Sequence, residues 1–582
     1  MENGKKGKKF EEKFKKSFED NNFIEKELHE DDKGNKRKRK VDNKKKNNSI
    51  IEINKLQTNK SLNNNFTNPF IPQSSPNILK SESPLNINEN SQNLNESKNF
   101  SLNDSDLNLI FEDSIKNGVN TTEETIRPNI SKIYYINGDK LTVNDLKDGR
   151  RIFNNKTEFS EYKGFKENFL EFRQLLFENL LLYEDFTENL KEKWTMESAI
   201  FSTFCYDPEF IEPLIKKFNI KSLIIKEAGN FTNGKSVEEQ EENITFIHPK
   251  LDYSMKWGKF HSKLTIFKFP DFIRVIIPSA NLTSGDWYYW GQIIWFQDFY
   301  KKNKTNANCI RDSTQKSDSD FEFYLGKVFE SVLPRGYTES KWFKNLNIKI
   351  DEYDFSFTCV DLVASASGRY NGENRNDYGV GRLRCLTESY SKSRSSLKNS
   401  LNKLTVQCSS IGRSLKDKFL SDLCEGLLCR KKSGRYNIDI IYPTVDYVES
   451  FQMGRELSSC LFLNQDTYQA NKEKFKKFEV IPEHEASKTI FHSKFFISSD
   501  NTEKASDNMI FYFGSHNFSI AAWGSFEKND SQLSIANYEL GIVFNPIKLK
   551  FEEKEKILKS LLINLNSSNY SNLDEAWIFD SL

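Results

Sequence analysis

A tetrapeptide, Phe-His-Ser-Lys, occurs twice in this chain of 582 residues. It stands in "GKFHSKLTIF", around His261, and again in "TIFHSKFFIS", around His492, although the whole chain has only six histidines. An apolar stretch, an asparagine and a tryptophan follow each copy in the same order: Asn281 and Trp287 after the first, Asn517 and Trp523 after the second. Because several features recur in one order, the repeat indicates an internal duplication and not a chance match.

The residues shared by the two copies suit the binding of a phosphoryl group. If the histidine and lysine of each word lie on a strand, they point to the same face, and the asparagine after the next strand reaches the same edge. Ammonium and amide groups are good donors to phosphoryl oxygens. Two facing sets would surround one phosphate, giving a phosphoryl-transfer site that needs no metal or other cofactor. The sets are His261, Lys263 and Asn281, and His492, Lys494 and Asn517.

Two histidines also permit a division of labour. One imidazole can attack phosphorus while the other protonates the leaving oxygen, and the second can then take a proton from water. The lysines and asparagines would stabilise the charge that develops on the non-bridging oxygens. Since catalytic imidazoles titrate near neutral pH, activity is expected to peak there. An isolated histidine is more often a structural residue, but the duplicated set favours the catalytic interpretation.

The remaining pattern predicts an α/β chain with two similar domains. Short β-branched runs bounded by Pro, Gly or polar residues are typical of buried strands, and stretches such as "KLKFEEKEKILKSLLINL" between them have a helical period. The amphipathic stretch 165–186 predicts a helix where order begins. We expect domains at 131–350 and 351–582, each with one copy of the tetrapeptide. The predicted strands include "SLIIK", "FIRVIIP", "IDIIYP", "MIFYFG" and "ELGIVF".

Residues 1–130 have a different composition. They are rich in Asn, Lys and Ser, as in "NKKKNNSI", and show little hydrophobic period. Such a segment cannot bury enough apolar surface to offset its ordering entropy, so we expect a disordered tail. Within it, "KRKRK" at 36–40 is the kind of basic run that serves as a nuclear localisation signal. A solvated charge run is an equally good interpretation of this motif.

Charge and cysteine content restrict the class of protein further. The formal net charge is only +1, so any attraction to nucleic acid must come from local patches. Eight cysteines scattered over a chain of this length indicate reduced thiols and not a disulfide framework. No apolar run is long enough to cross a bilayer, and the polar N-terminus lacks the apolar core of a signal peptide. We expect a soluble intracellular protein without a membrane partner.

With these motifs, the chain resembles the phospholipase D superfamily, in which His-x-Lys is followed after four residues by Asp. Lys268 and Ser499 occupy those positions here, so the Asp is missing from both copies. Its absence, with asparagine downstream, is similar to the pattern of the tyrosyl-DNA phosphodiesterase 1 family. The blocks "GQIIW", "IIYPTVDYV", "SHNFSIAAWG" and "QLSIANYELGIVF" also resemble that family, and the resemblance covers the chain from about residue 190 onward.

The resemblance implies a fold and roles for several residues. The fold would be a monomer of two phospholipase D-like domains, each with a mixed sheet between helices, related by a pseudo-twofold axis with the active site at their junction. His261 would be the nucleophile and His492 the general acid and base. Gln292 and Glu539 would orient the imidazoles, and an amide beside the acid would perturb it less than a carboxylate.

The resemblance also implies contacts with DNA. Trp257 would stack on a base. The stretch "CSSIGRSL" and the second asparagine block would contact the DNA backbone without reading bases, through hydroxyls, backbone amides and a cation. In these blocks the implied contacts are Ser410, Ile411, Gly412, Arg413 and Ser519.

The activity implied by the resemblance is DNA repair in the nucleus. The enzyme would hydrolyse the phosphodiester between a DNA 3′ end, single- or double-stranded, and a tyrosine derived from topoisomerase I, and would process other 3′ adducts, through a covalent phosphohistidine. One alternative is a phospholipase D-type lipid phosphodiesterase, which the missing Asp disfavours. The other is a catalytically inactive scaffold that binds DNA ends, which the two complete sets of residues disfavour.

Overall fold

In the computed structural model of the chain, the described residues all belong to the same one of its two units. The described residues are 134–136, 139–141, 149–157, 169–170, 172–175 and 196–579, the last range without 218, 228–236, 242, 253–257, 303–318, 334–345, 414, 430–435, 452, 482–488 and 501–504. The predicted disordered tail and its basic run therefore lie outside the described residues. None of the helices in the described part of the chain combines the length and the apolar character needed to span a bilayer.

The first half forms a nine-stranded mixed sheet in the order β4-β3-β11-β10-β9-β5-β6-β8-β7. Its centre is an antiparallel meander, β9-β10-β11, joined through β9 to the parallel pair β5 and β6. The strands are β3 (Phe153–Asn155), β4 (Phe169–Leu170), β5 (Ser198–Thr203), β6 (Lys221–Lys226), β7 (Val237–Glu241), β8 (Ile244–Ile247), β9 (Leu264–Lys268), β10 (Phe272–Pro278) and β11 (Ile293–Tyr300).

The second half forms a seven-stranded sheet in the order β12-β21-β18-β17-β14-β15-β16. Again an antiparallel set, β17-β18-β21, is joined to parallel strands, here β14, β15 and β16. The strands are β12 (Val360–Ser365), β14 (Lys403–Gln407), β15 (Asn437–Tyr442), β16 (Phe475–Lys477), β17 (Phe495–Ser499), β18 (Ile510–Gly514) and β21 (Glu539–Phe544). Two small sheets, β1-β2 (Tyr134–Ile136, Asp139–Leu141) and β13-β20-β19 (Gly368–Asn371, Gln532–Ile535, Ser525–Glu527), complete the strands of the described residues.

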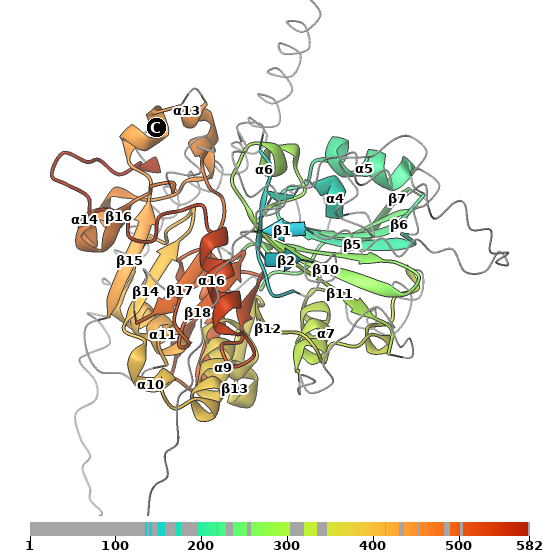
Figure 1. Cartoon of the computed structure of the whole chain (residues 1–582). Helices are drawn as coiled ribbons and strands as arrows, with labels where there is room; N and C mark the ends of the chain where they lie inside the picture. The colour runs from blue at the N-terminus through green and yellow to red at the C-terminus, as the bar shows by residue number, and fades with distance from the viewer. Residues whose placement is uncertain are drawn as a thin grey trace, which may run out of the picture. The chain divides into compact units, whose positions relative to one another are not determined.

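The two sheets have the same order over six strands, which confirms the α/β class and agrees with the internal duplication that the sequence predicts. β11-β10-β9-β5-β6-β8 corresponds to β21-β18-β17-β14-β15-β16, with the same parallel and antiparallel neighbours. In both halves a short helix follows the asparagine: α6 (Ser284–Tyr288) and α15 (Ile520–Trp523). Figure 1 shows the sheets side by side, with α6 near the junction between them. One sheet uses residues before 350 and the other residues after it, but the exact division into domains stays a prediction.

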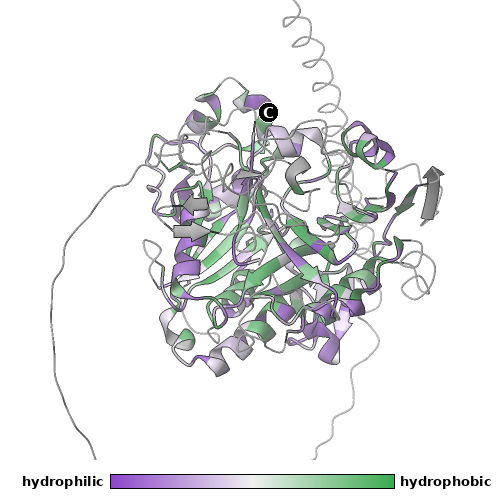
Figure 2. Cartoon of the chain, turned by 45° about the vertical axis from the view of Figure 1, so that its right-hand side comes forward, coloured by the Kyte–Doolittle hydropathy of each residue, from purple (hydrophilic) through white to green (hydrophobic). Residues whose placement is uncertain are grey.

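The core is built on the alternation of the strands. In β9, Leu264 and Ile266 face an apolar cluster shared by both halves, whereas Phe267 faces a second cluster on the outer side of the first sheet. In β17, Phe495 and Ile497 face the shared cluster and Phe496 the outer side of the second sheet. Figure 2 shows the hydrophobic colouring concentrated in these strands. The two sheets therefore share one apolar layer, which fixes how their edges meet.

Helices fill the shared layer and cover the outer faces. α7 (Phe321–Val332) and α16 (Phe551–Ser560) contribute to the shared cluster, and α9 (Gly379–Ser393) and α11 (Asp417–Leu427) pack together on the second half. The remaining helices include α4 (Phe172–Leu175), α5 (Pro208–Lys217), α10 (Leu397–Ser400), α12 (Val445–Glu449), α13 (Gly454–Leu457) and α14 (Gln465–Ala470).

Candidate active site

The sequence predicted that each Phe-His-Ser-Lys tetrapeptide lies on a strand. In the structure, both tetrapeptides lie instead in the extended segments that lead into β9 and β17. Each segment pairs with the opposite half of the molecule. Phe260 forms a parallel bridge with Tyr538, and Phe491 forms one with Gly291. The His261 amide donates to Tyr538 O at 2.9 Å, and the His492 amide donates to Gly291 O at 2.8 Å.

Glycine at 291 allows the second of these bridges. A Cβ at this position would lie 2.5 Å from the Phe491 ring, so a side chain would push the two segments apart. Both histidine backbones are thus fixed by main-chain hydrogen bonds to the other half. The catalytic segments cannot move independently of the junction between the sheets.

The residue after each bridge reaches toward the histidine of the other half. Glu539 Oε2 lies 2.8 Å from Nδ1 of His261 and accepts a hydrogen bond of 2.6 Å from Ser515 Oγ. In the first half, Ser279 Oγ donates at 2.6 Å to Oε1 of Gln292, in the same geometry. Each orienting group is therefore supplied by the half that does not carry the histidine it serves.

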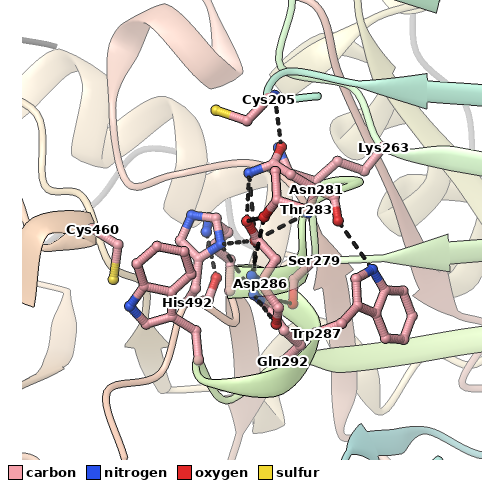
Figure 3. Close-up of polar contacts among 12 residues, drawn as sticks. Cys205, Lys263, Ser279, Asn281, Thr283, Asp286, Trp287, Gln292, Cys460 and His492 are labelled. Carbon is pink, nitrogen blue, oxygen red and sulfur yellow. Dashed lines mark hydrogen bonds and ion pairs between the residues drawn. The ribbon is translucent and has the colours of Figure 1, made fainter. Parts of the chain in front are cut away.

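His492 has a carboxylate neighbour that the sequence analysis missed. Its Nδ1 lies 3.0 Å from Asp286 Oδ1 and 3.3 Å from Gln292 Nε2 (Figure 3). A ring nitrogen that faces a carboxylate carries the proton, so it cannot also accept one from an amide. The Gln292 amide instead donates to Asp286 Oδ1 at 2.9 Å. Gln292 therefore lies beside His492, as predicted, and also holds Asp286, the carboxylate that faces the ring.

Asp286 connects several groups of the site. Its carboxylate accepts hydrogen bonds from Thr283 Oγ1 at 2.9 Å and from the backbone amide of Asn281 at 3.0 Å, and Asn281 Nδ2 lies 3.3 Å away. Burial by itself would raise the pKa of Asp286, but the hydrogen bonds and the charge of His492 outweigh it and hold that pKa well below its usual range. A buried, ionised carboxylate thus positions both the imidazole and the amide.

Both lysines bend back onto the main chain of their own histidine. Lys263 Nζ donates to His261 O at 3.1 Å, and Lys494 Nζ donates to His492 O. Burial is the main reason that the pKa of Lys263 falls to about 8 and that of Lys494 to about 7, and Lys263 lowers the latter further. Two ammonium groups so close together form a site that an oxyanion would stabilise.

The histidine pKa values are also lowered. Burial lowers the pKa of His261, against the opposing effect of Glu539, and Lys494 lowers it further. Burial and Lys494 lower the pKa of His492 to about 3, and Lys263 contributes. Since each lysine acts on the histidine of the other half, the two sets lie within electrostatic reach of one another. The structure therefore brings together the histidines and lysines of the two duplicated sets, and both imidazoles keep Nε2 for chemistry.

The two asparagines occupy equivalent places. Oδ1 of Asn281 accepts from the Cys205 amide at 3.3 Å, and Oδ1 of Asn517 accepts from the Ser410 amide at 3.3 Å. With the carbonyl oxygen turned to the backbone, the side-chain NH₂ group is the part that can donate to a ligand. Fixing the oxygen in this way fixes the orientation of the amide.

The residues predicted to contact DNA differ in how exposed they are and in whether their polar groups are already used within the protein. Ile411 is buried, its amide donates to Phe462 O, and the Gly412 amide donates to Phe518 O, so both N–H groups are used within the protein. Ser519 is partly exposed but caps α15 by accepting from the Ala522 amide at 3.2 Å. Ser410 is partly exposed and Arg413 exposed, and Trp257 lies outside the described residues. The hydroxyl of Ser410 and the Arg413 side chain therefore remain the better candidates.

Lys268 and Ser499, which occupy the positions of the phospholipase D Asp, are used within the protein fold and not for binding phosphate. Lys268 forms an ion pair with Glu197, and Ser499 is fully buried at the end of β17. In the described part of the chain, no group of three or more His, Cys, Asp or Glu side chains is arranged to hold a metal ion.

The family model described as tyrosyl-DNA phosphodiesterase matches residues 184–575, more than half of the chain. The chain belongs to this family. Among curated relatives, tyrosyl-DNA phosphodiesterase 1 of Arabidopsis thaliana is 29% identical over 381 residues, 61% of this chain and 58% of the relative, so somewhat more than half of that protein is matched. The probable tyrosyl-DNA phosphodiesterase of Schizosaccharomyces pombe is 24% identical, over 56% of this chain and 69% of the relative.

Solved structures of the same family share the fold. A crystal structure of a yeast tyrosyl-DNA phosphodiesterase mutant matches with a TM-score of 0.52 and 16% identity, over 74% of this chain and 99% of the yeast chain. The structure without a mutation matches with a TM-score of 0.50 over the same share of this chain. This likeness confirms the predicted two-part arrangement of mixed sheets and helices.

Proposed function

We propose that the protein is a DNA repair phosphodiesterase that hydrolyses the bond between a DNA 3′-phosphate and a tyrosine left by topoisomerase I, or another 3′ adduct. The observation that carries this proposal is that, where the two sheets meet, each half supplies the carboxylate that orients the histidine of the other half. Each of two histidines donates Nδ1–H to a carboxylate from the opposite half, and each has a lysine beside it. Such a pair of imidazoles, surrounded by cations, suits a two-step displacement at phosphorus.

In the first step, the Nε2 lone pair of His261 attacks phosphorus and the bond to the tyrosyl oxygen breaks. The negative charge of the bound phosphate raises the pKa of His492, and the doubly protonated ring gives its Nε2 proton to that oxygen, so that a covalent phosphohistidine remains. In the second step, water attacks phosphorus, its proton goes to His492 Nε2, and the P–N bond breaks. Glu539 stabilises the positive charge that His261 carries in the intermediate.

The proposal extends to the setting of the reaction. A basic run at 36–40 supports a nuclear protein, and a site completed by two halves of one chain supports a monomer. The substrate would be a single- or double-stranded DNA 3′ end that carries a tyrosyl peptide. Ser410 and Arg413, beside Asn517, would contact the backbone of the DNA strand without reading bases.

The test is an assay on a single-stranded oligonucleotide with a 3′-phosphotyrosine, in the presence of EDTA. We expect conversion to a 3′-phosphate at an unchanged rate in chelator, because two ammonium groups supply the positive charge. His261→Ala should show no turnover and no adduct. Turnover that is lost in EDTA and restored by magnesium would overturn the mechanism. Hydrolysis of phosphatidylcholine vesicles, with no cleavage of the oligonucleotide, would overturn the substrate.

A further inference from the structure

The two halves differ at one buried position beside the site. Ser279, Ala280 and Asn281 of the first half correspond to Ser515, His516 and Asn517 of the second, because β10 and β18 end just before them. Ala280 is 3% exposed and His516 is fully buried. A buried imidazole therefore stands between the serine that holds Glu539 and the asparagine of the site, where the other half has only a methyl group.

The hydrogen bonds of His516 define its protonation state. Ser365 Oγ donates to Ala522 O at 2.6 Å, because a carbonyl only accepts, and so its single proton is used. Ser365 Oγ can then only accept from Nε2 of His516, 3.0 Å away. Nδ1 carries no proton, and Tyr512 Oη donates to it. The ring is the neutral Nε2–H tautomer with both nitrogens satisfied.

The surroundings of this network are shaped to hold it. Gly514 and Gly541 leave room for the Tyr512 hydroxyl, since a Cβ at either position would lie 2.5 Å or 2.2 Å from Tyr512 Oη. The imidazole ring of His516 packs on the ring of Trp523, with centroids 4.2 Å apart.

This stacking changes the role of the repeated tryptophan. In the first half Trp287 Nε1 donates to Asn281 O at 3.0 Å. In the second half, Trp523 Nε1 is buried and has no hydrogen-bond partner among the described residues. His516 thus replaces a tryptophan hydrogen bond as the support of this segment.

We propose that His516 is a positioning residue for the nucleophile. It ties β12, β18 and α15 to the segment 515–517, which carries the Ser515 hydroxyl that donates to Glu539 and the Asn517 amide. Through Ser515 it fixes the carboxylate that orients His261. Among the described residues its ring nitrogens bond to Ser365 and Tyr512 and not to Asp286, so it acts on one histidine of the pair and not on the other. This inference rests on the proposed function only where reaction steps are measured.

The ionisable groups around His516 are Tyr512, Glu539 and His261. Burial lowers the pKa of His516 to about 3, Glu539 opposes this and His261 adds to it. Burial and the charge of Glu539 raise the pKa of Tyr512 far above its usual value. The network therefore stays neutral over the working range of the enzyme, which agrees with a fixed support.

The first test needs no activity. The full chain, labelled with ¹⁵N at its histidines, should show a slowly exchanging Nε2–H tautomer from pH 5 to 8 that disappears in His516→Gln. In His516→Ala, the Nδ1–H signal of His261 should move toward that of a weaker hydrogen bond, and the His261 pKa should fall because Glu539 is less well held. A signal of His516 that titrates near pH 6.5, or an unchanged His261 signal in His516→Ala, would overturn the inference.

The second test measures the reaction. With an activated aryl ester at the DNA 3′ end, the first step needs no proton from His492. His516→Ala should slow adduct formation 10- to 100-fold and move the acid limb of kcat/KM to lower pH, and His516→Gln, whose amide can still donate to Ser365, should recover most of the rate.

Tyr390→Phe is the matched control for stability, since it removes a buried hydrogen bond to Asp361 in the same half. A similar loss of Tm with an unchanged rate is expected for this variant. If His516→Ala loses Tm but keeps the rate on the activated ester, His516 only fills space. If the unaltered protein does not cleave the oligonucleotide at all, the proposed function fails, and the His261 signal alone decides the inference.

Discussion

Replacement of Asp286 by Asn tests the part of the site that the sequence did not reveal. The change keeps the size of the side chain but replaces one acceptor oxygen with an NH₂ group, which can only donate. All the surrounding groups also donate, since Asp286 accepts hydrogen bonds from His492, Gln292, Thr283 and the Asn281 amide. The His492 ring loses a hydrogen bond to a charged group, which is worth about 1.5–3 kcal/mol. At 1.36 kcal/mol per factor of ten, the steps that use His492 should slow roughly 10- to 150-fold.

The two steps should not slow equally. A phenol with a pKa of about 10 can leave without full protonation, whereas attack by water on the phosphohistidine depends on a base. Asp286→Asn should therefore accumulate a covalent DNA–protein species at His261, visible on a denaturing gel with a 5′-labelled oligonucleotide. Glu539→Gln, the matched control in the other half, should slow adduct formation and accumulate nothing. A loss of less than threefold in Asp286→Asn, or an adduct that maps to His492, would refute the assignment of Asp286 and of the two histidines.

Three further predictions concern charge, stability and the tail. Because the pKa of Lys494 is lowered to about 7 and an anion would raise it, binding of tungstate should take up protons and weaken as the pH rises above 7, by up to about tenfold per pH unit for one proton. Calorimetry in buffers of different ionisation enthalpy measures this, and equal affinity at pH 6 and 9 would contradict it. The folded pKa values of His492 and His516 are about 3, below the unfolded value of 6.5, so the unfolded chain binds more protons between these values and stability falls as the pH falls. At pH 5 each should cost about 2 kcal/mol relative to pH 8, and denaturant unfolding of His516→Gln should show a smaller loss on acidification than the parent. Deletion of residues 1–130 should keep cleavage within a few-fold, and neutral residues at 36–40 should reduce nuclear accumulation in a microscopy assay; an inactive but folded truncation would show that the tail completes the site.

The pattern of short apolar runs was enough to predict the main strands of the two sheets. The five predicted strands are all present. Short β-branched runs bounded by Pro, Gly and polar residues pack well on the pleated surface of a sheet, so the local sequence already favours a strand. The helix expected in "KLKFEEKEKILKSLLINL" is α16. The stretch 165–186 was predicted less well, since its described part contains strand β4 before helix α4. Pairing with β3 decides that conformation, and a helical period cannot show it.

Asp286 was missed because its partner lies on the other half of the chain. Comparison of the repeats held a signal: Asp286 precedes Trp287, whereas Ala522 precedes Trp523. Where the two copies carry different residues at an equivalent position beside the histidine and asparagine motifs, the difference can indicate a role that only one copy has. His516 opposite Ala280 is a second difference of the same kind. The assignment of hydrogen bonds at both places still required the packing of the halves, which no local pattern contains.

The exchange of orienting carboxylates between the halves affects how the protein is made. While the chain is being synthesised, the first half leaves the ribosome with His261, Lys263 and Asn281, but without Glu539, which lies near the end of the sequence. A partly synthesised or truncated chain thus holds an imidazole with nothing to align it.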